Sequence, residues 1–77
     1  MNISQLNEEL KERFLQEHYI KLNTQLNDEG NLLIFLAEPS EENYVNYTNI
    51  INKYLEDEML GDYILDGDYE GIIEIYS

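Results

Sequence analysis

The side chains in this sequence that can do chemistry are mostly carboxylates, and they are concentrated in its second half. Residues 38–77 hold eleven acidic residues and one basic residue, Lys53, in a chain whose formal net charge is −13. Between positions 56 and 74 there are eight carboxylates and no base. They are Glu56, Asp57, Glu58, Asp62, Asp66, Asp68, Glu70 and Glu74. A surface of this kind attracts a basic protein or a cation.

The same charge excludes two classes of direct partner. Nucleic-acid binding needs Lys and Arg to displace counterions from phosphates, and the chain has four such residues in all. An anionic membrane surface repels carboxylates. We therefore expect no direct binding to nucleic acid or membrane, and we expect the partner to be a basic protein surface.

The residues that usually carry catalysis give little support for an enzyme. His18 is the single histidine, and it falls where a predicted helix meets a predicted strand, which favours a junction or surface position. The serines have no plausible base near them in the sequence, and no glycine-rich phosphate loop follows a predicted strand. We predict a protein that is not an enzyme and that uses no cofactor.

Residues 66–71 match part of a calcium-binding EF-hand loop. Asp66, Asp68, Glu70 and Gly71 occupy positions 1, 3, 5 and 6 of such a loop. The twelfth position, which should be a bidentate glutamate, is Ser77, and residues 72–76 favour a strand over the exiting helix. We interpret this segment as a hairpin turn and predict no metal site, with loose binding of a divalent cation as the alternative.

The spacing of apolar residues predicts the elements that hold these side chains. From Ile3 to Phe14 apolar residues recur every three or four positions, which predicts a helix capped by Asn2 or Ser4. From residue 20 to 26 they alternate, which predicts a strand. Residues 27–30 form a predicted turn in which Gly30 supplies a positive φ.

Residues 32–37 are apolar at every position, which is typical of a strand covered on both faces. In so small a domain its own helices can cover one face. The other face must meet a partner, a second copy of the chain or an overlying loop. Leu33 and Phe35 are therefore candidates for a homodimer interface, and the alternative is that they belong simply to the central strand.

A second helix is predicted to begin at Ser40, where Glu41 and Glu42 suit the positive end of the helix dipole. Gly61 is the predicted C-cap. The buried stripe is predicted to be Tyr44, Tyr47, Ile51, Tyr54, Leu55 and Met59. Residues 56–58 crowd the negative end of the dipole, where carboxylates are unfavourable, so they serve function or the helix frays early.

Residues 62–76 alternate with a period of two. Apolar side chains dominate the odd positions, and all five carboxylates occupy the even ones. This predicts two antiparallel strands with one buried and one solvent-exposed face. A turn within 66–71 must contain an odd number of residues or a bulge, because otherwise Glu74 would point inward.

These elements predict one acidic α+β domain over residues 1–77, in the order α-β-β-α-β-β, with two helices on one face of an antiparallel sheet. The sequence has no apolar run typical of a signal peptide or of a bilayer-spanning helix. We expect a protein of the cytoplasm, either of a bacterium or of an infected host cell.

Carboxylates on alternate residues of a strand lie about 6.6 Å apart, which is similar to the spacing of phosphates along a nucleic acid. Asp66, Asp68, Glu70 and Glu74 are therefore predicted to form a row that fits a groove lined by Arg and Lys. The alternative interpretation is that these acids only keep a small protein soluble.

In size, charge and predicted architecture the chain resembles small nucleic-acid-mimicking inhibitors from phages and mobile elements, among them anti-CRISPR and anti-restriction proteins, and acidic immunity proteins that cap nucleases. The resemblance rests on no motif. We expect a non-enzymatic inhibitor that uses the eight carboxylates of residues 56–74 to occupy a basic, nucleic-acid-binding surface. The alternatives are a homodimeric adaptor that pairs through residues 32–37 and a cation-responsive protein.

Overall fold

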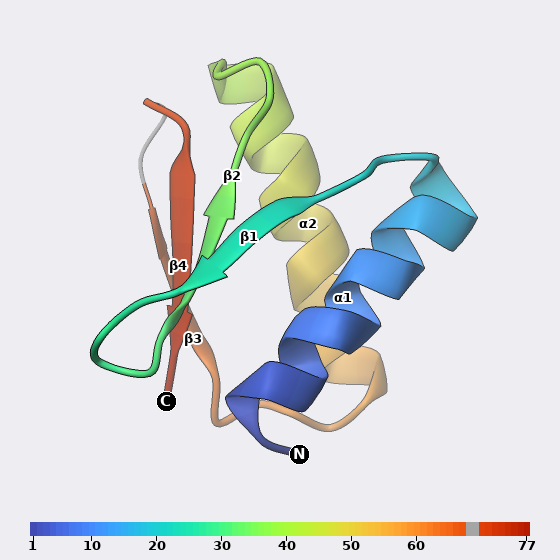
Figure 1. The fold of residues 1–77 in the computed structure, drawn as a ribbon. Coiled ribbons are helices and arrows are strands. Elements are labelled where there is room, and N and C mark those ends of the chain that lie inside the picture. Colours follow the sequence, from blue (N-terminus) through green and yellow to red (C-terminus); the bar gives the residue numbers. More distant parts are fainter. Residues whose placement is uncertain (68–69) are drawn as a thin grey trace.

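The computed structural model describes residues 1–67 and 70–77, which form two helices and a four-stranded antiparallel sheet (Figure 1). The elements are α1 Ile3–His18, β1 Asn23–Leu26, β2 Leu32–Phe35, α2 Glu41–Asp57, β3 Ile64–Gly67 and β4 Ile72–Tyr76. The predicted α+β class and the order α-β-β-α-β-β are confirmed. β1 is shorter than the alternating segment 20–26, because its pairing with β2 begins at Asn23.

Both helices begin where the sequence predicts. The Asn2 side chain accepts a hydrogen bond from the Gln5 amide at 2.8 Å, and the Gln5 side chain accepts one from the Asn2 amide at 2.9 Å. This reciprocal pair is a capping box. The hydroxyl of Ser40 caps α2 by accepting from the Asn43 amide at 3.1 Å. These bonds satisfy amides that have no partner within their helix.

The end of α2 differs from the prediction in two ways. Met59, and not Gly61, takes the left-handed conformation, with φ 57°, and Met59 is 92% exposed although it was predicted to be buried. The amide of Leu60 donates to the carbonyl of Leu55 at 2.8 Å, and Leu60 packs against the core. Because Leu60 must turn inward directly after the helix, the reversal of the chain falls on the residue before it.

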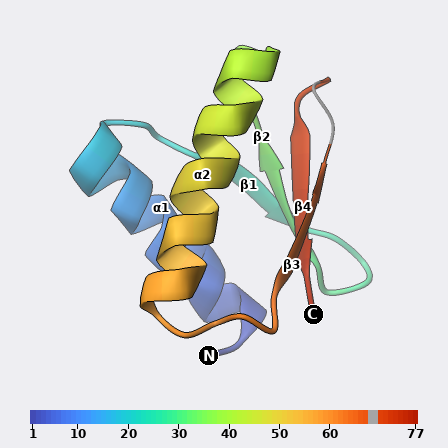
Figure 2. The same ribbon diagram turned by 180° about the vertical axis from the view of Figure 1, so that it is seen from behind.

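The strands are ordered β1-β2-β4-β3, and every neighbouring pair is antiparallel. Both helices lie on the same side of this sheet, as Figure 1 shows and as Figure 2 shows from behind. The core between the two layers includes Leu6, Leu10 and Phe14 of α1, Ile51, Tyr54 and Leu55 of α2, and Leu32, Ile34, Ile73 and Ile75 of the central strands. The predicted two-layer packing is therefore confirmed.

β3 and β4 form the predicted hairpin. Gly67 pairs with Ile73 and Asp66 with Glu74, so an odd number of residues separates the two members of each pair. Ile73 is fully buried, whereas Glu74 keeps the outward parity of Asp66. This register confirms the prediction that the connection between the strands keeps Glu74 on the outward face.

Candidate partner-binding surface

The sheet face turned away from the helices brings predicted carboxylates and predicted interface residues together. We call it the open face, because neither helix lies on this side of the sheet (Figure 2). The strand registers define its members on the four strands, and hydrogen bonds to Glu74 add two residues that flank the β1–β2 turn. They are Asn23, Gln25, Asn27, Asn31, Leu33, Phe35, Ile64, Asp66, Ile72, Glu74 and Tyr76.

The centre of the open face is largely apolar. Leu33 and Phe35 lie half-buried on β2, which is one of the two inner strands. Phe35 is directly paired with Ile72 of β4, and Ile64 of β3 is paired with Tyr76. Ile72 and Ile64 are 42% and 50% exposed. The two residues predicted as an interface therefore lie on a face that the helices of this chain leave uncovered.

Glu74 is held in the middle of the open face by two amide side chains. Its Oε2 accepts hydrogen bonds from Asn31 Nδ2 at 2.8 Å and from Asn27 Nδ2 at 3.3 Å. Asn27 is itself fixed, because its Oδ1 accepts from the backbone amides of Glu29 and Asn31. A carboxylate can only accept, so both amide groups must turn toward it. These bonds join the β1–β2 turn to β4 and set the direction of the Glu74 side chain.

Asp66 lies beside Glu74 on the neighbouring strand. The two residues are directly paired across β3 and β4. Directly opposed residues on antiparallel strands have Cβ atoms about 5 Å apart, and like charges in that arrangement repel. The Asp66 side chain is exposed, and it makes no hydrogen bond or ion pair with the other described residues. A cation placed between the two carboxylates would relieve their repulsion.

The carboxylates at the end of α2 belong to the helical layer. Glu56 and Asp57 lie in the last turn of the helix, and Glu58 is its C-cap. Lys53 Nζ lies 3.8 Å from a carboxylate oxygen of Asp57, and an Arg13 nitrogen lies 3.7 Å from one of Glu58. Exposed ion pairs of this kind contribute little stability, but they lower the negative charge at this end of the molecule.

Of the four residues predicted to form a row, Asp66 and Glu74 lie together on the sheet. Asp62 is exposed in the turn before β3. Glu70 lies in the turn before β4, where it interacts with another group of the same chain. Asp68 falls outside the described residues. The pair formed by Asp66 and Glu74 is the part of the predicted row that the sheet holds in place.

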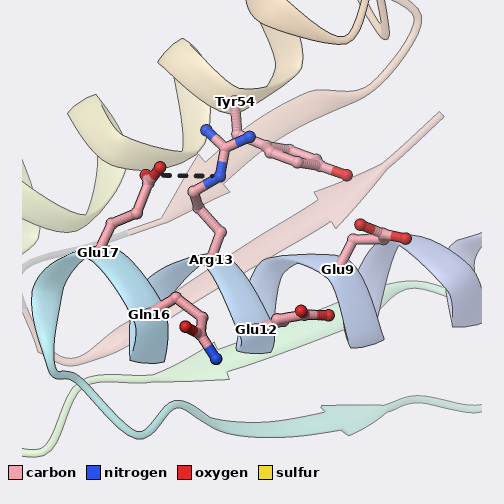
Figure 3. A pocket seen from close by; sticks show the side chains of 6 residues that line it. All are labelled: Glu9, Glu12, Arg13, Gln16, Glu17 and Tyr54. Carbon is pink, nitrogen blue, oxygen red and sulfur yellow. Dashed lines mark ion pairs between the residues drawn. The ribbon is translucent and has the colours of Figure 1, made fainter.

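A polar pocket of about 190 Å³ lies where α1 meets α2 (Figure 3). It is lined by Glu9, Glu12, Arg13, Gln16, Glu17 and Tyr54. The Arg13 side chain lies 3.4 Å from Glu17 and stacks on the Tyr54 ring, 5.0 Å from its centre. Burial, followed by the charges of Glu9 and Glu58, raises the pKa of Tyr54, and Arg13 opposes the rise. These contacts join the two helices, so we assign the pocket a structural role.

Of the candidates for catalysis and metal binding, the structure places those within residues 1–67 and 70–77. His18 is exposed at the end of α1, with its ring 6.1 Å from that of Phe14. Among the described residues, no three His, Cys, Asp or Glu side chains are grouped so that they could hold a metal ion. Residues 72–76 form β4 in place of the exiting helix of an EF-hand. No helix in the described part of the chain is long and apolar enough to cross a membrane.

The sequence prediction missed part of the open face. Ile64, Ile72 and Tyr76 share the even positions of the tail with the carboxylates, and that parity already indicated an outward face that is partly apolar. The bonds from Asn27 and Asn31 to Glu74 depend on how β2 pairs with β4. No local pattern in the sequence specifies that pairing.

Comparisons with known proteins find no matching family model, no matching curated protein and no matching solved structure. The function is therefore argued from the charge of the chain and from the geometry of the open face.

Proposed function

We propose that this protein is a non-enzymatic inhibitor that occupies a basic, nucleic-acid-binding surface on a target protein, such as an effector or a nuclease. It would act in the manner of the nucleic-acid-mimicking inhibitors that it resembles in size and charge. Such targets act in the cytoplasm of a bacterium or of an infected host cell, and we infer the same location for this chain.

The distribution of charge carries the proposal. Residues 38–77 contain eleven acids and one base, and the sheet displays Asp66 and Glu74 together on its open face. A groove lined by Arg and Lys that normally receives phosphates offers complementary charge to this surface. Complementary charge raises the association rate of two proteins and makes it sensitive to ionic strength.

The test is capture of basic targets by the immobilised protein from a bacterial lysate, followed by elution with NaCl. We expect nucleic-acid-binding proteins or nucleases to elute between about 0.15 and 1 M NaCl, and DNA or RNA to compete with the protein for them. Replacing Asp66 and Asp68 with Asn, and Glu70 and Glu74 with Gln, should weaken binding to the captured protein by about 100-fold, measured by calorimetry.

A matched variant controls for loss of charge alone. Glu8→Gln, Glu12→Gln, Asp28→Asn and Glu29→Gln together also change the net charge from −13 to −9, because each variant removes four acids. This control should bind nearly as well as the original chain. The proposed site is wrong if the tail variant retains its affinity or if both variants lose it equally.

A homodimeric adaptor is the second candidate. It is favoured by Leu33 and Phe35, which lie half-buried in the centre of a sheet face that neither helix covers. Sedimentation velocity separates the two candidates, since an adaptor of this kind is a dimer without any target. The carboxylates of Asp66 and Glu74 on the same face disfavour self-pairing, and for this reason the inhibitor is our conclusion.

A further inference from the structure

We infer that the open face is the docking site for an amphipathic, basic helix of a partner protein, which presents a row of apolar side chains flanked by Arg or Lys. This inference rests on the proposed function and makes it more specific, because it names the face that binds and the chemistry of the element that it receives.

The apolar residues of the open face lie on three strands, in the row that contains Glu74 and Asp66 and on both sides of it. The strand registers place Phe35 of β2 beside Ile72 of β4, and Tyr76 of β4 beside Ile64 of β3. Leu33 follows Phe35 on the same face of β2, since outward side chains alternate along a strand. Covering apolar surface stabilises a complex by about 25 cal/mol for each Å² removed from water. These residues therefore favour an occupant with apolar side chains of its own.

The carboxylates lie inside this apolar surface. Leu33, Glu74 and Asp66 are directly paired in one row across β2, β4 and β3. A purely apolar occupant would remove two carboxylates from water with only the amide hydrogen bonds to Glu74 as compensation, which is strongly unfavourable. The occupant must therefore bring a cation to this row. Arg and Lys suit the position, because their aliphatic stems can lie over Ile72 or Tyr76 while the charged group reaches Asp66.

A second copy of the chain does not meet this requirement. Two copies related by a two-fold axis present the same surface to each other, so pairing through the open face brings Asp66 and Glu74 of one copy toward those of the other. Each copy also carries a formal charge of −13. Charge complementarity thus selects a basic partner over a second copy.

A helix suits the open face better than a strand does. The opposite side of the same sheet is already packed against the apolar faces of α1 and α2. A partner helix with apolar residues at three- and four-residue steps has an apolar face of the same kind, and it can pack on the open face in the same way. A strand would instead pair with the free edges of β1 or β3, which are the outer strands of the sheet. Within the described residues, β2 and β4 are paired on both sides, so the centre of the open face offers side chains.

Three synthetic helical peptides of about 18 residues, or five turns, test the inference. The first carries Leu along one face with Arg on both flanks, the second replaces each Arg with Glu, and the third replaces each Leu with Ser. We expect the first peptide alone to bind tightly, with binding that weakens in salt. In methyl NMR spectra the signals of Leu33, Ile64 and Ile72 should shift, while those of Leu10 and Ile51 in the core stay in place.

Two variants with the same change of charge locate the contact. Ile72→Lys alters the open face, and Leu15→Lys alters α1, where Leu15 is 52% exposed. We expect Ile72→Lys to weaken binding of the first peptide at least about tenfold and Leu15→Lys to have little effect. Both positions are exposed, so both variants should keep the melting temperature of the original chain within a few degrees.

Each other outcome contradicts the inference. If both variants lose affinity equally, charge alone drives binding, and the proposed function stands while the docking face is wrong. If the Ser peptide binds as well as the Leu peptide, the apolar contact is wrong. If the chain sediments as a dimer that Ile72→Lys dissociates, a second copy occupies the face. Failure of all three peptides to bind refutes the docking helix, whereas failure of salt-eluted capture separately refutes the inhibitor.

Discussion

Met59 follows the end of α2 in a backbone conformation that L-residues rarely adopt, with φ 57°. Its side chain is almost fully exposed, so it gains no packing in return. Tyr19 repeats the arrangement at the end of α1, where φ is again 57° and the side chain is 89% exposed. Glycine is usual at such positions, because it has no Cβ to clash with the next carbonyl. Both helices therefore carry a small amount of backbone strain at their ends.

Replacing Met59 with Gly should stabilise the protein by about 1 kcal/mol, since the left-handed conformation is unstrained in glycine. Urea denaturation measures the gain as a higher midpoint with an unchanged slope. Met59→Ala is the matched control, because alanine also lacks the long side chain but keeps the Cβ clash. Equal stability of the Gly and Ala variants would show that the Met59 backbone is not strained.

The hairpin of β3 and β4 is positioned by two close approaches to the rest of the fold. A Cβ at Gly71, where φ is 122°, would lie 2.8 Å from Cγ of Pro39. A Cβ at Gly67 would lie 2.8 Å from the carbonyl oxygen of Ile72 and 3.0 Å from the ring of Tyr44. A Cβ at either position would therefore force a neighbouring atom to shift, and the hairpin that carries Asp66 and Glu74 packs against the start of α2.

Gly71→Ala should lower the free energy of unfolding by about 2 kcal/mol, because it adds both a steric clash and a strained φ. The control is Gly61→Ala, where nothing lies within 4 Å of the new Cβ and φ is not positive. That control should change stability by less than about 1 kcal/mol. Thermal denaturation followed by circular dichroism measures both variants. A smaller loss at Gly71 than at Gly61 would contradict the close packing of the hairpin.

Local patterns in the sequence predicted the elements but not how distant elements pair. The alternation around Glu74 was sufficient to assign Ile73 and Ile75 to the core, because parity is a local property of a strand. The pairing of Leu33 with Glu74 joins strands that are separated by the whole of α2, and no neighbouring residue encodes it. For this reason the amide bonds to Glu74 and the grouping of apolar residues from three strands on the open face appeared only in the structure.

The whole molecule is about as small as the distance over which its charges repel one another. Its radius of gyration is 11.3 Å, and its formal net charge is −13. At 0.1 M salt the screening length is about 10 Å, so carboxylates on opposite sides of the molecule still repel at lower ionic strength. This repulsion opposes compaction and is independent of any single ion pair.

Adding NaCl from about 0.01 to 0.5 M at neutral pH should therefore raise the melting temperature. A gain of 1 kcal/mol corresponds to about 4–8 °C for a domain of this size. The tail variant, whose net charge is −9 after four acids are removed from −13, should show a smaller rise. Differential scanning calorimetry measures both slopes. A melting temperature that is insensitive to salt in the original chain would show that repulsion does not limit its stability.

β4 comes after the other three strands in the chain and yet lies inside the sheet, between β2 and β3. During synthesis on the ribosome, β1 and β2 are complete long before their inner neighbour has been made. The nascent chain therefore keeps one edge of β2 without a partner until residues 72–76 leave the exit tunnel. Translational pausing before that point should prolong exposure of the unpaired edge of β2, a strand whose side chains are all apolar.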